Sequence, residues 1–296
     1  MRVLVTGSSG FLGQHLCNAL EENGHVVVEY DISEGYDIMD GAKLVQTILK
    51  NDVSDVIHLA AIADLYIAKS KPDYTYRINI EGTLCVLSAC EQIGIPMLFA
   101  STCCAYGNNG VHPSSESAPL VPGEIYAETK VIAEGLISQA QGHHTIMRLA
   151  TFYGPQQRGS LATSVFLERA MSGLPIFIHG NGEQNRTFTH VEDIVAGIIC
   201  TLESPARPSV VNISTNQSYS VNELVSICMR LTKNVEIVYV DDRPGQILQE
   251  EIDNSVLCSL GWEQKFDLYE GLATCINSSS KIHISSSTNA EEVLVE

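Results

Sequence analysis

Short apolar runs and longer segments of helical spacing alternate through the first half of the chain. Mostly apolar runs of four or five residues predict buried strands at 3–6, 26–30, 56–60, 96–100 and 145–149. Between them, apolar residues recur every three or four positions, which predicts helices at 11–22, 43–50, 72–92 and 126–141. This repetition predicts an α/β fold, with a doubly wound parallel sheet and right-handed crossovers over residues 1–150.

The regular alternation of predicted strands and helices ends after residue 150. Helical spacing continues, but the segments between become loop-like at 152–157 and turn-like at 176–186, and one strand is expected at 235–240. The helices are expected at 163–172, 190–202 and 221–231. We therefore expect a smaller α+β region over 151–276, with the chain returning to the first domain near 189–213, and a polar, mobile tail at 277–296.

Composition excludes several classes of protein. Of 296 residues, 45% are hydrophobic and 18% charged, which is typical of a folded domain and not of a disordered or fibrous chain. The 17 basic and 35 acidic residues leave a net charge of −18, so a nucleic-acid partner is not expected. No run of 18 apolar residues occurs, so no membrane span is expected. Nine scattered cysteines without a C-x-x-C pair, and no signal-peptide pattern, indicate reduced thiols in a cytoplasmic protein without a metal site.

A glycine-rich turn joins the first strand to the first helix. It contains Gly7, Ser9, Gly10, Phe11, Leu12 and Gly13. The first glycine allows a sharp turn, the second allows the backbone to approach a pyrophosphate, and the third allows close packing of helix on strand. The helix N-terminus then offers N–H groups to the phosphates, which supplies anion binding in an acidic chain. The strand–turn–helix context predicts a Rossmann-type dinucleotide site.

Asp31 ends the second predicted strand, at the distance expected for a ribose-binding acid. A carboxylate can accept hydrogen bonds from the adenosine ribose but repels a 2′-phosphate, and no Arg or Lys lies beside it in the sequence. The sequence therefore predicts NAD and not NADP.

Tyr126 and Lys130 are four residues apart on a predicted helix and so share one face. A free phenol ionises near pH ~10, and a neighbouring ammonium favours the phenolate, so the pair can act as a general base. Thr102 follows the fourth strand, where its hydroxyl can bridge the substrate oxygen and the phenol, with Ser101 as the second candidate.

These motifs, with further blocks along the chain, make it similar to extended short-chain dehydrogenases/reductases of the nucleotide-sugar epimerase/dehydratase family. The similarity runs from about residue 2 to 272. The further blocks are Asp37-Ile38, His58-Leu59-Ala60-Ala61, Asn79 with Gly82-Thr83, Arg148 with Tyr153-Gly154-Pro155, the run 186–193, Asn212-Ile213, Arg243-Pro244-Gly245 and Leu260-Gly261-Trp262.

The resemblance implies roles for several of these residues. Asp37 and Ile38 would border the adenine. The backbone of Leu59, Ala60 and Ala61 would lie along the cofactor ribose and phosphates. Asn79 and Lys130 would help to hold the nicotinamide half, beside Ser101. Arg186 and Arg243 would pair with the diphosphate of a nucleotide sugar, which suits the forked guanidinium. The resemblance also implies a homodimer formed through the helices around 72–92 and 124–141.

Two departures from the family pattern bear on the substrate and the reaction. Thr151 stands three residues after Arg148, where relatives often carry an Asn that binds the nucleotide sugar. Cys103 and Cys104 stand at the two positions where 4,6-dehydratases of the family have an Asp-Glu pair, the acid and base that remove water. This sequence has neither carboxylate there, which argues against that reaction. Some relatives use a nearby Cys as an acid or base, and a thiol beside the nicotinamide can be activated, although packing of small thiols under the sheet is the alternative.

The leading hypothesis is an NAD-dependent 4-epimerase acting on a UDP-hexose through a transient 4-keto sugar. The alternatives are a 5,6- or 4,6-dehydratase, or a keto-sugar 3,5-epimerase or reductase, that uses Cys103 or Cys104. A non-catalytic NAD-binding scaffold is a more remote alternative, because a scaffold needs neither Tyr126 nor Lys130.

Overall fold

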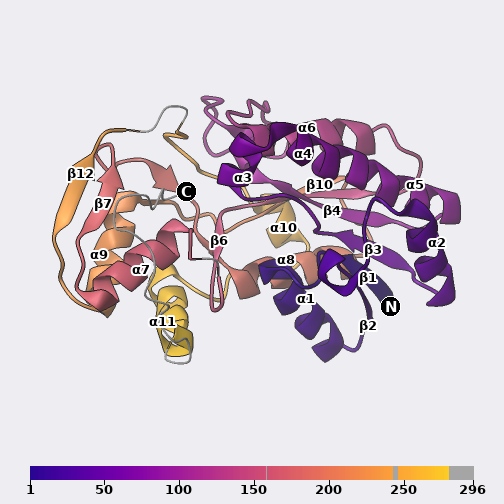
Figure 1. Ribbon diagram of the computed structural model, residues 1–296, viewed down its shortest axis with the longest axis horizontal. Helices are drawn as coiled ribbons and strands as arrows, with labels where there is room; N and C mark the ends of the chain where they lie inside the picture. The colour runs from indigo at the N-terminus through magenta and orange to yellow at the C-terminus, as the bar shows by residue number, and fades with distance from the viewer. Residues whose placement is uncertain (158, 243–245, 280–296) are drawn as a thin grey trace.

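A six-stranded parallel sheet forms the larger part of the protein (Figure 1). The computed structural model describes residues 1–157, 159–242 and 246–279. In spatial order the strands are β10 (Val210–Ile213), β5 (Thr145–Leu149), β4 (Met97–Thr102), β3 (Asp55–His58), β1 (Arg2–Thr6) and β2 (Val26–Tyr30). All five pairings are parallel, so the predicted doubly wound sheet is confirmed.

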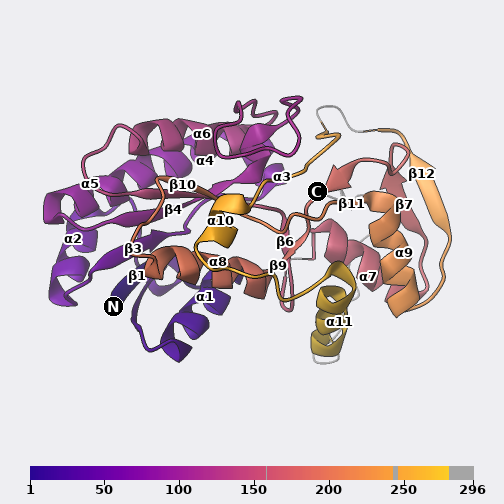
Figure 2. The same cartoon turned by 180° about the vertical axis from the view of Figure 1, so that it is seen from behind.

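Helices cover both faces of this sheet, as Figures 1 and 2 show. One face carries α1 (Phe11–Glu22), α8 (Val191–Glu203) and α10 (Ser255–Ser259). The other carries α2 (Gly41–Lys50), α5 (Thr83–Ile93) and α6 (Ile125–Ile137). Because both faces are buried, the strands can consist almost wholly of apolar residues. No helix in the described ranges is both long and apolar enough to cross a membrane.

The predicted helix over 72–92 is instead three segments. The chain runs through α4 (Pro72–Tyr76), a π-helical segment η2 (Arg77–Gly82) and then α5, after a short helix α3 (Leu65–Ser70) that sequence reasoning missed. A π segment widens the helix locally and often marks a functional site. Here it turns the Asn79 carboxamide onto Ile62, whose N–H and C=O it bonds at 2.7 and 3.0 Å.

Most of the residues after β5, apart from α8, β10 and α10, form a second, smaller part beside the carboxyl ends of the strands. It contains α7 (Ala162–Ser172), α9 (Val221–Leu231) and α11 (Leu268–Ser279), which share one core with the paired strands β7 (Ile176–His179) and β12 (Ile237–Val240). Two further pairs are β6 (Phe152–Tyr153) with β9 (Thr189–His190), and β8 (Asn185–Arg186) with β11 (Tyr219–Ser220). The 3₁₀ turns are η1 (Ile32–Glu34) and η3 (Cys103–Tyr106).

Three expectations for this part change. The segment 152–157, expected to be loop-like, begins with strand β6, and the segment 176–186, expected to be turns, holds β7 and β8. In each case the partner strand lies far along the chain. Of the expected tail, 277–279 end α11, and 280–296 lie outside the described residues. The chain does return to the large sheet through α8 and β10, while the domain boundaries themselves stay a prediction.

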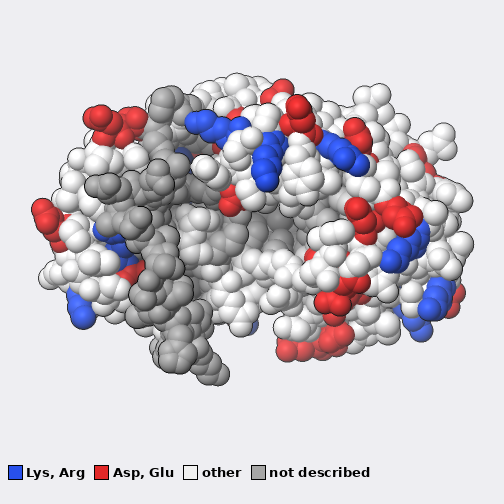
Figure 3. Space-filling view, viewed as in Figure 1, with Lys and Arg blue, Asp and Glu red and all other residues white. Residues whose placement is uncertain are grey.

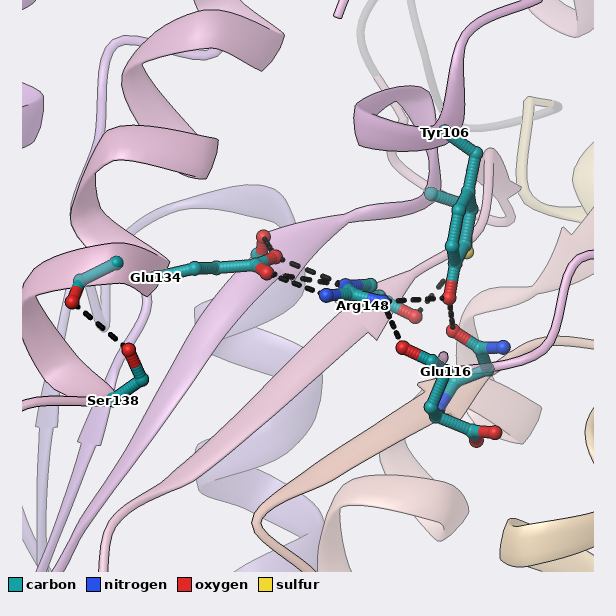
Figure 4. Close-up of polar contacts among 9 residues, drawn as sticks. Tyr106, Glu116, Glu134, Ser138 and Arg148 are labelled. Atoms are coloured by element: carbon teal, nitrogen blue, oxygen red, sulfur yellow. Dashed lines mark hydrogen bonds and ion pairs between the residues drawn. The ribbon is translucent and has the colours of Figure 1, made fainter. Parts of the chain in front are cut away.

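A buried ion pair ties the sheet to α6 (Figure 4). Arg148 on β5 donates through Nη2 and Nε to Glu134 on α6, at 2.7 and 3.2 Å, and both side chains are almost wholly buried. Arg148 also donates through Nη1 to the Tyr106 hydroxyl at 2.9 Å and to the Glu116 carbonyl at 2.8 Å. Tyr106 in turn donates to Asn212 on β10 at 2.6 Å. The network therefore fixes α6, η3 and two strands relative to one another.

Replacing Glu134 by Gln should lower the free energy of unfolding by about 3 kcal/mol, because the Arg148 charge stays buried without its counter-ion. Urea unfolding followed by circular dichroism measures this. The matched control is Glu203→Gln, since Glu203 pairs with His25 but is 47% exposed. That variant should change stability by less than about 0.5 kcal/mol. Equal losses in the two variants would contradict the role given to the buried pair.

Candidate functional site

The glycine loop after β1 packs so closely against neighbouring backbone that side chains would not fit at two of its positions. Gly7 has a φ of +73°, and a Cβ there would lie 2.8 Å from the Ala60 nitrogen. A Cβ on Gly13 would lie 2.2 Å from the Gly7 carbonyl oxygen. Helix α1 begins after Gly10 without a side-chain cap, and the buried Ser8 hydroxyl has no partner among the described residues. Uncapped N–H groups at a helix start fit a pyrophosphate.

Asp31 joins the end of β2 to this loop. Its carboxylate accepts from the Ser9 N–H at 3.2 Å and from the Ser33 N–H and hydroxyl at 2.9 and 2.8 Å. The carboxylate is thereby held beside the start of α1, where the ribose of a dinucleotide bound to the loop would lie.

The residues expected at the adenine, ribose and phosphates border the same region. Leu59, Ala60 and Ala61 follow β3, and the Ala60 N–H donates to the Thr6 hydroxyl at 3.2 Å. Ile38 is buried against Gly82 of η2, and the Asp37 carboxylate accepts from the Met39 N–H at 2.9 Å. Phe11 and Leu12 lie in the first turn of α1, and Leu12 is part of the core.

Tyr126 and Lys130 occupy the first two turns of α6. Lys130 is buried, and its Nζ donates to the Ala100 carbonyl on β4 at 2.8 Å and lies 5.9 Å from the centre of the Tyr126 ring. Burial lowers the pKa of Lys130 to about 7, although Glu134 acts in the opposite direction. Burial thus works against the ammonium, whereas the Ala100 carbonyl and Glu134 favour it. Asn79 supports this helix by donating to the Thr129 hydroxyl at 3.0 Å.

The two hydroxyl groups at the end of β4 have different surroundings. Ser101 donates to the Glu134 carboxylate of the buried network. Thr102 accepts from the Cys104 N–H at 3.1 Å through the same hydroxyl that could donate onward. Because the Ser101 hydroxyl is already bonded to Glu134, Thr102 stays the first candidate for the substrate-facing role predicted from the sequence.

Cys103 and Cys104 begin η3 directly after Thr102. Cys103 is buried and its thiol donates to the Arg148 carbonyl at 3.3 Å. Burial raises the pKa of Cys104 to about 12 and also raises the pKa of Cys103 well above its usual range. This is opposite to the shift that a thiolate base needs, so neither thiol is prepared to remove a proton.

The predicted substrate residues lie on the smaller part. Arg186 on β8 donates through Nη1 to the carbonyls of Asn185 and Ile247, at 2.8 and 2.7 Å. Thr151 precedes β6, where its carbonyl accepts from the Thr189 N–H at 2.9 Å. Arg243 lies outside the described residues. Figure 3 shows the surface hollowed between the sheet and this smaller part.

Comparison with known proteins identifies the family. The model of the NAD dependent epimerase/dehydratase family matches residues 3–214. The chain belongs to this family. A UDP-glucuronic acid decarboxylase of Arabidopsis thaliana is 30% identical, over 92% of this chain and 87% of that protein. A putative UDP-glucose 4-epimerase of Methanocaldococcus jannaschii is also 30% identical, over 93% and 97%. The crystal structure of UDP-glucose 4-epimerase from Thermotoga maritima with UDP-glucose matches with a TM-score of 0.89 at 29% identity, over 95% and 99% of the two chains.

Membership of the epimerase/dehydratase family confirms the expected fold, the resemblance and NAD as the cofactor. It also shows an enzyme family that modifies nucleotide sugars. The roles assigned above to single residues stay predictions.

Sequence reasoning missed the contacts that support the site. Arg148 and Asn212 stood out only as parts of family-like blocks, and their bonds to Glu134 and Tyr106 join separate elements, so no local motif predicts these contacts. Glu250 was also missed; it is buried beside Thr187, whose N–H it accepts at 3.0 Å.

Replacing Gly13 by Ala should weaken NAD binding more than tenfold, because the added Cβ must push the Gly7–Ser8 carbonyls out of place. Isothermal titration with NAD measures the affinity. Gly135→Ala is the matched control, since Gly135 is on α6 and a Cβ there meets nothing within 4 Å. It should keep the native affinity and stabilise the helix slightly. Native-like NAD binding by the Gly13 variant would show that the loop is not the cofactor site.

Proposed function

We propose that this chain is an NAD-dependent nucleotide-sugar 4-epimerase that acts on a UDP-hexose through a transient 4-keto sugar. The observation that carries the oxidation at C4 is the position of Lys130, bonded to Ala100 of β4 and 5.9 Å from the Tyr126 ring. Sequence and structural similarity to UDP-glucose 4-epimerases over nearly the whole chain supports the same reaction.

The protein side of the reaction follows from these groups. Tyr126 takes the proton of the C4 hydroxyl, and the Lys130 charge stabilises the phenolate. Thr102 donates a hydrogen bond to the oxygen as negative charge develops on it. The chemistry that NAD supplies when bound is reversible hydride exchange with C4. If the keto sugar rotates in the site and takes the hydride back on its other face before Tyr126 returns the proton, the C4 configuration is inverted without net oxidation.

A second candidate is favoured by the thiols of η3. Because burial keeps Cys103 and Cys104 protonated, either can supply a proton to a sugar that has been oxidised at C4. The epimerase reaction has no step for such an acid, whereas a dehydratase, a keto-sugar 3,5-epimerase or a reductase does. All of these begin with the same oxidation at C4, so Tyr126 and Lys130 do not separate them.

Replacing Tyr126 by Phe should lower kcat by a factor of about 10² to 10⁴, because general acid–base catalysis is lost. NAD affinity should stay near native, since the glycine loop and Asp31 are untouched. Turnover of UDP-glucose and NAD titration measure the two effects. Tyr269→Phe, at an exposed tyrosine on α11, should leave both unchanged. A fully active Tyr126 variant would favour the non-catalytic scaffold.

Cys104→Ala separates the epimerase from the alternatives. Native and variant protein are incubated with UDP-glucose, UDP-N-acetylglucosamine and dTDP-glucose, and the products are identified by NMR. We expect 4-epimers and a change in turnover of less than threefold for the variant, because 4-epimerisation uses no thiol. Products that have lost water, together with a collapse of turnover in the variant, would replace the epimerase with a dehydratase.

We also propose that the enzyme works as a homodimer. The proposal rests on the family resemblance, and the helices concerned are α4, η2 and α5, with α6 beside them.

A further inference from the structure

Asn108 bonds a distant segment of the chain, residues 246–248, at two points. Its carboxamide donates through Nδ2 to the Gln246 carbonyl at 3.1 Å and accepts through Oδ1 from the Leu248 N–H at 2.9 Å. A carboxamide can make both bonds at once because one end is a donor and the other an acceptor. Two bonds to backbone groups two residues apart fix the position and the direction of the 246–248 segment.

The same segment also contacts β8. The Leu248 carbonyl accepts from the Asn185 N–H at 3.0 Å, and the Ile247 carbonyl accepts from Nη1 of Arg186 at 2.7 Å. The 246–248 segment therefore joins Asn108 to the strand that carries the residue proposed for the diphosphate.

The contact with Ile247 decides which edge of the Arg186 guanidinium is left for a ligand. Nη1 is held by the Ile247 and Asn185 carbonyls, whereas Nε and Nη2 have no hydrogen-bond partner among the described residues. With these same two nitrogens, Arg148 binds both oxygens of Glu134. The oxygens of a phosphate fit this edge in the same bidentate way. The Ile247 carbonyl thus orients Arg186 so that its phosphate-binding edge stays available.

Asn108 is tied to the reacting end of the site through the backbone. Turn η3 begins directly after Thr102, and Gly107 and Asn108 follow it. Gly107 has a φ of +54°, and a Cβ there would collide with the Val121 carbonyl oxygen, so only glycine lets the chain leave η3 in this direction. The place of Asn108 is therefore set by the same turn that follows Thr102.

The charge of Arg186 acts on this turn as well. Burial raises the pKa of Cys104, in η3, to about 12, and the Arg186 charge acts against this rise. Such an effect requires the guanidinium to lie near the thiol. Asn108 and the 246–248 segment thus connect two neighbouring parts of the site, the end of β4 and the guanidinium of Arg186.

We propose that Asn108 is a positioning residue for substrate binding: it holds the 246–248 segment, whose Ile247 carbonyl orients Arg186 toward the diphosphate of a nucleotide sugar. This rests on the proposed function, because the diphosphate contact of Arg186 belongs to it. It adds a residue that acts through Arg186 and not on the reacting sugar. The loop after η3 then affects the affinity for the substrate and leaves the chemical step unchanged.

A double-mutant cycle tests this coupling, with UDP titrated calorimetrically into the NAD-loaded protein. Asn108→Ala should weaken UDP binding at least fivefold, because the 246–248 segment loses both of its bonds to the carboxamide. Arg186→Gln should weaken it at least tenfold. In the Arg186→Gln background, Asn108→Ala should change the affinity by less than twofold, since no guanidinium is left to orient. With UDP-glucose as substrate, Asn108→Ala should raise KM at least fivefold and keep kcat within twofold of native.

Asn23→Ala is the matched control, because the exposed Asn23 also donates through Nδ2 to a backbone carbonyl, that of Ala19 at the end of α1. It should leave the UDP affinity within twofold of native. An unchanged affinity in Asn108→Ala, or equal losses in the two backgrounds, would overturn the proposal, because Asn108 would then not act through Arg186. If Asn108→Ala does not fold, Asn108→Ser takes its place in the cycle with the same criteria, since a serine hydroxyl is too short to reach Gln246 and Leu248 together.

The two proposals fail in different ways. If the cycle shows the coupling but UDP-glucose gives no 4-epimer, the epimerase is wrong while the role of Asn108 stands. If the 4-epimer forms and the cycle shows no coupling, only the role of Asn108 is wrong. If the native protein does not bind UDP, both are overturned.

Discussion

The buried pair of Arg148 and Glu134 is the contact on which the geometry of the site depends. It joins β5 to α6 where both side chains are buried, and a buried charge is tolerated only with its partner in place. Glu134 is one turn beyond Lys130 and also holds Ser101. The pair therefore fixes the distance between the helix that carries the proposed base and the strand whose end carries Thr102.

An acidic protein holds its anionic ligands here with few positive charges. The chain has a net charge of −18, so the long-range field opposes a dinucleotide and a nucleotide sugar alike. The glycine loop offers the anionic ligands backbone N–H groups and the N-terminus of α1, and both of these attract an anion only at close range. Arg186 is the described cation proposed for the diphosphate, and its neighbour Glu250 is an acid. Recognition in this site must then rest on local geometry, and long-range attraction contributes little to it.

Sequence reasoning succeeded where the signal is local. The strand at 26–30 and the helices at 11–22 and 221–231 have the predicted bounds, because period and flanking turn residues lie within one window. It failed where the deciding partner is distant. Residues 176–179 become a strand only by pairing with 237–240, and glycines nearby gave the opposite indication. The same holds for the site. Tyr126 and Lys130 form a local motif, whereas Glu250 meets Thr187 and Cys103 only after the chain has folded.

The π segment at 77–82 constrains how this chain can change length. It contains one more residue than a regular helix would need to span the same rise. Deleting a single residue from it would restore a continuous helix and rotate Asn79 by about 100° away from Ile62. Loss of one residue here would break the bonds between Asn79 and Ile62, and the loop after β3 would no longer be held. Natural or engineered variants should thus tolerate indels in the loops around this segment far better than within it.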